Sequence, residues 1–174
     1  MKSLKLIVAT LGCLFLFAFS EIEFGDANPL TSLFKIERSK DNNQIFYDVN
    51  LNSTGNFDLE NPINIYWIRN TEGGKIKPLT WIQQKYAYGL KFLNVNDEYA
   101  TFRFVSSKEM YFTLKKSSKN HFEVYSKYNN QLLNIHRIFI QLDGGTFWFP
   151  NITAVKVFAT NVKTGKAVIE TITP

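Results

Sequence analysis

The stretch LFKIERSKDNNQIFYDVN, residues 33–50, contains two runs of alternating apolar and polar side chains with a polar segment between them. In the first run, for example, Phe34 and Ile36 lie on the same side of an extended chain. Such alternation is typical of a strand with one buried and one solvated face. The stretch therefore predicts an antiparallel hairpin of two strands, over residues 33–38 and 44–50, joined by a polar loop.

Further runs of this kind follow, separated by turn residues. They cover residues 63–69, 99–105, 110–116, 121–128, 132–142, 153–161 and 167–173, with a short one over 146–149. Short strands at this spacing are typical of a sandwich or a barrel. We therefore expect residues 33–174 to form a single, mainly β domain, an antiparallel β-barrel or β-sandwich of about nine strands.

Two features of the later strands predict local backbone geometry. Asn129 and Asn130 can both adopt the left-handed conformation that a two-residue type I′ hairpin turn requires. Along residues 132–142 the apolar side chains change phase at His136. A bulge or a bend near residue 136 would account for the change of phase.

One segment breaks the β pattern. Thr80 and Gln83 have the spacing of a capping box, in which a hydroxyl and an amide satisfy the first backbone groups of a helix. Gly89 stands where a C′ glycine ends a helix. The sequence thus predicts one short helix, over about residues 80–88.

The first twenty residues predict export. Lys2 and Lys5 precede an apolar run that extends from residue 6 to residue 19. This is the pattern of a secretory signal peptide, with cleavage expected after Ser20. The apolar run is shorter than the ~20 residues that a transmembrane helix needs, so we expect the mature protein to be periplasmic or extracellular and not integral to the membrane.

Cys13 leaves lipoprotein processing as an alternative, in which the chain is cut before the cysteine. Thr10 stands where such sites usually have leucine, and the apolar run continues beyond Cys13, so the signal peptide is favoured. Residues 21–32 have no sustained period, and we expect them to be a flexible lead-in to the first strand.

Composition excludes several classes of protein. Loss of residues 1–20 would lower the formal charge from +5 to +3, and the remaining lysines and arginines form no long block, so nucleic-acid binding is not supported. The single cysteine would leave with the signal peptide, which leaves no disulfide in the mature chain. Aromatic residues are frequent at 16%, and in a β protein they belong first to the core and to cross-strand pairs.

Catalytic, metal and cofactor motifs are absent from the sequence. It contains no G-x-S-x-G elbow, no H-E-x-x-H helix and no glycine-rich phosphate loop. With two histidines and no mature cysteine, a metal site is hard to assemble. A hydrolase with paired carboxylates stays open as a third hypothesis, with the candidate acids Asp48, Asp58, Glu60, Asp97 and Glu98, although their spacing selects no pair.

The segment from residue 66 to residue 88 has the most unusual chemistry, because aromatic rings stand there beside amide and cationic groups. Such a mixture suits a lipid, a glycan or a peptide. The candidate ligand-binding residues are Tyr66, Trp81, Gln84 and Tyr88. The alternative is that Ile65, Trp67, Ile82 and Tyr86 simply pack the helix onto the sheet.

A second aromatic cluster, Phe147-Trp148-Phe149, follows a diglycine turn. Three consecutive side chains cannot all face one side of a strand. We therefore expect Trp148 to contribute to a surface for a protein partner.

Four short stretches support a comparison with a known family: residues 34–39 (FKIERS), 61–68 (NPINIYWI), Leu79-Thr80 and Ala87-Tyr88-Gly89. Together they resemble the exported-protein family known as domain of unknown function 4833, over about residues 33–173. The resemblance implies an exported domain of this size. It transfers no catalytic residue, because the family has no assigned activity.

The sequence thus favours an exported, non-catalytic binding domain for a small apolar or glycan ligand or a peptide, without a cofactor. A structural or assembly protein that contacts another envelope protein is the alternative, because exposed strand edges offer ready pairing groups.

Overall fold

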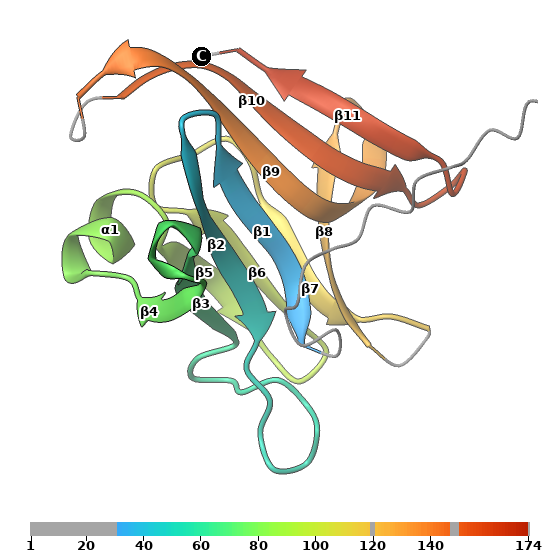
Figure 1. Cartoon of the computed structure of the whole chain (residues 1–174). Coiled ribbons are helices and arrows are strands. Elements are labelled where there is room, and N and C mark those ends of the chain that lie inside the picture. Colours follow the sequence, from blue (N-terminus) through green and yellow to red (C-terminus); the bar gives the residue numbers. More distant parts are fainter. Residues whose placement is uncertain (1–30, 119–120, 147–149, 174) are drawn as a thin grey trace, which may run out of the picture.

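The computed structural model describes residues 31–118, 121–146 and 150–173, and within them the mainly β class is confirmed (Figure 1). The strands are β1 (Ser32–Arg38), β2 (Asp41–Val49), β3 (Ile63–Arg69), β4 (Lys75–Pro78), β5 (Leu90–Val95), β6 (Tyr99–Phe104), β7 (Phe112–Lys116), β8 (Phe122–Tyr128), β9 (Gln131–Gly145), β10 (Pro150–Asn161) and β11 (Ala167–Ile172). The helix is α1 (Trp81–Tyr86), and η1 (Asn70–Glu72) is a single 3-10 turn.

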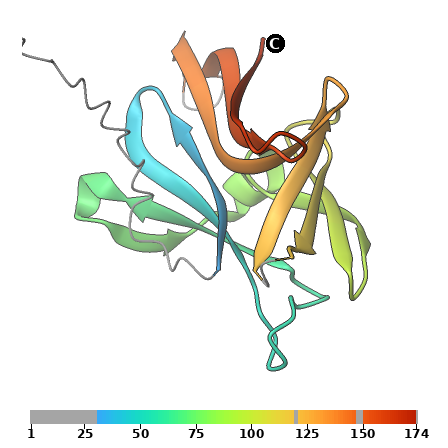
Figure 2. The same ribbon diagram turned by 90° about the vertical axis from the view of Figure 1, so that its right-hand side faces the viewer.

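All eleven strands belong to one sheet, which is organised around β9, the longest strand. One edge of β9 pairs with β10, which carries β11. The other edge is shared: β8 pairs with residues 131–134, and β1 pairs with residues 137–140. Two four-stranded wings therefore extend from the same edge of β9, in the orders β1-β2-β3-β4 and β8-β7-β6-β5 (Figures 1 and 2).

The core lies between the two wings. Phe34 of β1 stacks on Tyr47 of β2, with ring centroids 4.4 Å apart. Both rings meet Phe104 of the other wing edge-on, at 6.1 Å and 5.7 Å. Phe112 of β7 adds a further ring beside Phe34, at 6.4 Å. The alternation in the first hairpin is thus explained, because its apolar face turns toward the other wing.

The sheet curls into a half-barrel, and the described residues form neither a closed barrel nor two separate sheets (Figure 2). The half-barrel stays open between β3 and β5, because among the described residues these two strands do not pair with each other. The expectation of purely antiparallel pairing was wrong in one place, because β1 and β9 are parallel. β1 and β9 are far apart in the chain, and a parallel partner of this kind leaves no sign in the local sequence pattern.

Two of the strands, β4 and β5, were not predicted from the sequence. β4 has only four residues, all exposed, so its pairing with β3 is what makes it a strand. β5 begins four residues after α1 ends. Its short alternation of Leu90, Lys91 and Phe92 directly follows the residues that were assigned to the helix, and it was not recognised as a strand. The predicted helix is present but shorter than residues 80–88, since it ends at Tyr86.

Both predicted local features of the later strands are confirmed. Asn129 and Asn130 have φ angles of 47° and 60°, the left-handed values of the tight turn between β8 and β9. The pairing of β9 with β10 shifts by one residue between Ile135 and Arg137, so His136 is the additional residue of a β-bulge. A bulge increases the local bend of a strand, and this bend helps β9 to pair with both β8 and β1.

Four predictions fall wholly or mainly on residues outside those described: the signal peptide of residues 1–20, the lead-in up to residue 30, the short strand over 146–149, and Trp148 as part of a partner surface. Within the described residues, no helix has the length and apolarity needed to cross a membrane.

Candidate functional site

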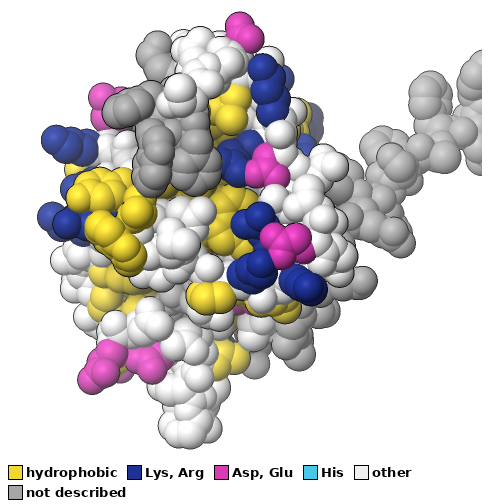
Figure 3. Space-filling view, turned by 60° about the vertical axis from the view of Figure 1, so that its left-hand side comes forward, with side chains coloured by type: hydrophobic (Ala, Val, Ile, Leu, Met, Phe, Trp, Pro, Cys, Tyr) yellow, Lys and Arg dark blue, Asp and Glu magenta, His cyan; other side chains and the backbone are white. Residues whose placement is uncertain are grey.

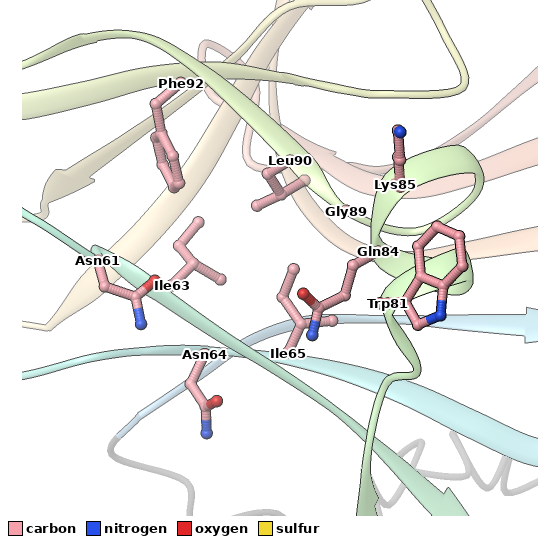
Figure 4. Close-up of a pocket in the computed structure, with 10 residues that line it drawn as sticks. All are labelled: Asn61, Ile63, Asn64, Ile65, Trp81, Gln84, Lys85, Gly89, Leu90 and Phe92. Carbon is pink, nitrogen blue, oxygen red and sulfur yellow. The ribbon is translucent and has the colours of Figure 1, made fainter.

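An open groove of about 540 Å³ lies where the half-barrel stops, between β3 and β5, with α1 at one end (Figure 4). It is lined by Asn61, Ile63, Asn64 and Ile65 from β3 and the residues before it, by Trp81, Gln84 and Lys85 from α1, and by Gly89, Leu90 and Phe92 at β5.

The groove has an apolar floor and a polar rim. Ile63 is buried, and Ile65, Leu90 and Phe92 are partly buried against the core of the half-barrel. Asn61 and the α1 residues that line the groove are exposed at its margin. Figure 4 shows Ile63 and Leu90 between the two strands. This arrangement offers apolar contact below and hydrogen bonds above.

α1 is held in place by hydrogen bonds that the sequence pattern predicted in part. The capping box is confirmed: Gln83 donates its backbone N–H to Thr80 Oγ1 at 3.3 Å, and Thr80 donates its backbone N–H to Gln83 Oε1 at 2.9 Å. Gln83 Oε1 also accepts from Trp67 Nε1 at 3.2 Å. A single amide therefore caps the helix and fixes it to β3, which sets the position of Trp81 and Gln84 over the groove.

Gly89 has a different role from the predicted one. The helix ends through Ala87, and Gly89 does not have a positive φ, so it is no C′ glycine. A Cβ atom on Gly89 would lie 1.9 Å from the carbonyl oxygen of Gln84. Glycine is thus required because the backbone of α1 approaches the start of β5 too closely for any side chain.

Tyr88, a predicted ligand contact, lies in a cluster behind the groove. Its hydroxyl accepts from Arg38 at 3.0 Å, and its carbonyl accepts from the hydroxyl of Tyr47 at 2.8 Å. Arg38 also lies 5.2 Å from the ring of Trp67 and pairs with Asp41. Burial raises the pKa of Tyr88, so the phenol stays neutral and hydrogen-bonded at physiological pH. These contacts stabilise the junction of β1, β3 and α1.

Tyr66, a second predicted contact, points to the opposite face of β3. Its hydroxyl donates to Asp48 Oδ2 at 2.8 Å, and its ring stacks on Phe46 with centroids 5.8 Å apart. Burial raises the pKa of the Asp48 carboxyl, and the hydrogen bond from Tyr66 only partly offsets this. Tyr66 does not line the groove, because these contacts hold its side chain beside Asp48 and Phe46.

The raised pKa of Asp48 predicts a specific pH dependence of stability. The folded chain binds this proton more tightly than the unfolded chain, so the protonated form favours folding at acidic pH. That contribution is lost as the pH rises from the ordinary value of 3.8 through the higher folded pKa. Asp48→Asn should therefore gain stability relative to the wild type as the pH rises, measured by urea unfolding at a series of pH values.

Glu37 provides the control of opposite sign. Burial raises the pKa of its carboxyl, but Lys35 and Arg137, with nitrogens 2.8 Å and 3.0 Å from its oxygens, outweigh that effect and lower it. Its contribution is present above the unfolded pKa and is lost as the pH falls. Glu37→Gln should thus lose stability relative to the wild type as the pH rises. A difference between Asp48→Asn and wild type that does not change with pH would contradict the assignment.

The structure brings two of the four predicted residues together at the groove, Trp81 and Gln84. The residues of the alternative differ in burial: Trp67 is buried, Ile82 is half-buried, and Tyr86 is 62% exposed and does not line the groove. Sequence reasoning missed Leu90 and Phe92, although their alternation with Lys91 was a usable signal.

The candidate acids do not form a site at the groove. Asp48 bonds to Tyr66 on the far face of β3, and Asp58 Oδ1 accepts from the backbone N–H groups of Glu60 and Asn61 in a loop turn. Asp97 and Glu98 are exposed in the turn after β5. Among the described residues, no three histidine, cysteine, aspartate or glutamate side chains are placed to hold a metal ion.

These features define the class of protein: a mainly β domain whose single sheet curls into a half-barrel and leaves an open, helix-capped groove. The model of one protein family, described as "Domain of unknown function (DUF4833)", matches residues 34–171, and the chain belongs to this family. The membership of this family that the four sequence stretches predicted is thereby confirmed. Neither a curated protein nor a solved structure matches the chain.

Proposed function

We propose that this protein is a non-catalytic binding domain that holds an elongated, partly apolar ligand in the groove between β3 and β5. The observation that carries the proposal is the chemistry of the groove, an apolar floor of Ile63, Leu90 and Phe92 beneath amide and lysine side chains. Polar side chains make up much of the lining, which suits a ligand that carries hydrogen-bonding groups beside an apolar part.

Trp81 supports the proposal separately. Its side chain is 67% exposed, although α1 is held firmly through Gln83. A large aromatic side chain on a fixed helix supplies contact area without much loss of conformational entropy on binding, which is why tryptophan is frequent among residues that dominate binding energy. Figure 3 shows that apolar side chains gather near lysine and arginine on the side of the molecule that carries α1.

We further propose that the domain acts after export, in the periplasm or outside the cell. The support is the sequence of residues 1–20, with two lysines ahead of an apolar run. Mass spectrometry of the natural protein tests this directly: we expect a mature N-terminus at Glu21. A protein that retains Met1 and stays in the cytoplasm would contradict this part of the proposal.

Two variants on the same helix test the groove. Trp81→Ala should weaken ligand binding by about tenfold, because it removes aromatic contact area worth more than ~1 kcal/mol. Tyr86→Ala is the matched control, since Tyr86 is similarly exposed on α1 but does not line the groove, and its affinity should change less than about twofold. Titration calorimetry with a zwitterionic detergent, a chitin oligosaccharide and a library of short peptides supplies the measurement. Equal effects of the two substitutions would place the ligand elsewhere.

The second candidate function is assembly with an envelope protein, and the free edge of β11 favours it. β11 pairs with β10 alone among the described residues, and Ile169 on it is exposed. Edge strands of this kind readily pair with another chain. Crosslinking in cells separates the candidates: a recurring protein partner linked through β11 supports assembly, and a monomer whose groove is occupied supports the binding domain.

A further inference from the structure

The two walls of the groove are strands with unpaired edges. β5 is the last strand of its wing, and among the described residues it pairs with β6 alone. β4 pairs with β3 from Tyr66 onward, so residues 63–65 of β3 have no strand beside them on the groove side. The regular free edge of β5 extends from Leu90 to Phe92, because the ladder with β6 is irregular between Phe92 and Asn94, and the free edge of β3 is equally short.

The direction of the free backbone groups follows from the pairing register. Val105 donates its backbone N–H to the carbonyl of Gly89 at 2.9 Å, which makes these residues a hydrogen-bonded pair of the β5–β6 ladder. Hydrogen-bonded and non-hydrogen-bonded pairs alternate along antiparallel strands. Leu90 and Phe92 therefore direct their N–H and C=O groups away from β6. Both residues line the groove, so these groups open into it.

The same rule applies to the opposite wall. Asn50 donates its backbone N–H to the carbonyl of Pro62 at 2.9 Å, so Ile63 directs its backbone groups away from β2 and toward the groove, whereas the same groups of Ile65 adjoin the end of β4. An acyl chain in the groove would strip water from backbone donors and acceptors on both walls and offer them no partner. Unsatisfied buried backbone groups are costly, which disfavours a purely apolar occupant.

We propose that the ligand of the groove is an extended peptide that adds as a strand to the free edge of β5. This inference rests on the proposed binding function and names its ligand. The peptide's backbone bonds to Leu90 and Phe92, and alternate side chains of the peptide, apolar in character, point to the floor formed with Ile63. Recognition of this kind takes its affinity from main-chain hydrogen bonds and its specificity from the pockets beneath alternate residues.

Charge adds one element to the peptide's chemistry. Lys85 stands at the α1 end of the groove, and it takes part in none of the ion pairs between described residues. Its ammonium group lies 5.3 Å from the ring of Tyr86, so it stays close to the helix surface. An acidic residue at the corresponding end of the peptide would complement it.

The test uses the whole mature protein and acetylated, amidated peptides of about six residues, the usual length of a strand, in which apolar residues alternate with threonine and one end carries glutamate. The tightest peptide of this library is then made again with a single N-methyl group on each amide in turn. Methylation of every second amide should weaken binding by about tenfold, since it removes a main-chain hydrogen bond and leaves its partner unsatisfied. Methylation of the amides between them should change affinity far less.

Amide hydrogen exchange gives an independent readout at named residues. The N–H groups of Leu90 and Phe92 should exchange markedly more slowly with the peptide bound, whereas that of Lys91, which faces β6, should be protected with or without it. Lys85→Ala should lower the affinity for the glutamate peptide more than the affinity for its glutamine analogue.

The outcomes separate this inference from the function on which it rests. If the detergent or the chitin oligosaccharide binds the groove and weakens with Trp81→Ala while no library peptide binds, the inference is overturned and the binding function stands. If peptides bind but tolerate methylation at every amide equally, strand addition is excluded. If none of the three probe classes binds, both proposals are wrong.

Discussion

Phe112→Ala is expected to destabilise the protein by ~3–5 kcal/mol, the usual cost of deleting a fully buried aromatic side chain. Phe112 is 1% exposed and meets the rings of Phe102 and Phe104 at 5.5 Å and 5.2 Å within its own wing. It also faces Phe34 of the other wing. The substitution therefore opens a cavity at the centre of the aromatic core, where both wings contribute and neither can relax alone. A domain's total stability is only ~5–15 kcal/mol, so part of the population should unfold.

Tyr111, the neighbouring residue, is the control for this prediction. It is 56% exposed, and Tyr111→Ala should change the free energy of unfolding by less than ~0.5 kcal/mol. Urea unfolding measures both variants, with an unchanged dependence on urea expected if the unfolded state is unaltered. Equal losses for the two variants would mean that the alternation in this segment does not define the core.

Gly89→Ala should destabilise the protein and also abolish binding at the groove. The new Cβ would fall 1.9 Å from the carbonyl oxygen of Gln84, a backbone atom that cannot move unless α1 moves. Overpacking of this kind typically costs ~1–3 kcal/mol. A displaced helix would strain the bond from Trp67 Nε1 to Gln83 Oε1 and carry Trp81 away from the floor of the groove.

Gly165, which lies in a surface turn, is the control that distinguishes the steric clash at Gly89 from a general effect of replacing a glycine. Gly165 has a φ of 68° and no atom within 4 Å of the position where a Cβ would lie, so Gly165→Ala should cost ~1–2 kcal/mol through backbone strain alone. Both variants should unfold at lower urea concentration, but Gly89→Ala alone should lose ligand affinity. A Gly89→Ala protein with normal binding would show that the helix position does not control the groove.

Local features were predictable from sequence because their causes are local. A capping box needs only Thr80 and Gln83 at the right spacing, and a tight turn needs two residues such as Asn129 and Asn130 that tolerate a positive φ. The bulge at His136 followed from a phase change within one strand. Alternation of apolar residues likewise identified most of the strands, since burial of one face imposes a period of two.

The candidate site was only half predictable, because its geometry depends on which face each residue turns to the core. Aromatic and amide composition pointed to Tyr66 and Tyr88 as well as to Trp81 and Gln84, but Tyr66 lies on the opposite face of β3 and Tyr88 bonds to Arg38 inside the structure. Composition records which groups are close in the chain. It does not record the side of the sheet on which they emerge.

The sequence by itself determined the mainly β class, the position of the short helix and the turn and bulge that shape the later strands, since each depends on neighbours in the chain. Tertiary structure alone decided that β1 lies parallel to β9, that β4 and β5 are strands, and that the sheet stops curling between β3 and β5. Those outcomes depend on pairing between segments far apart in sequence. The groove exists because β5 and the start of β3, which β4 does not cover, approach one another without pairing.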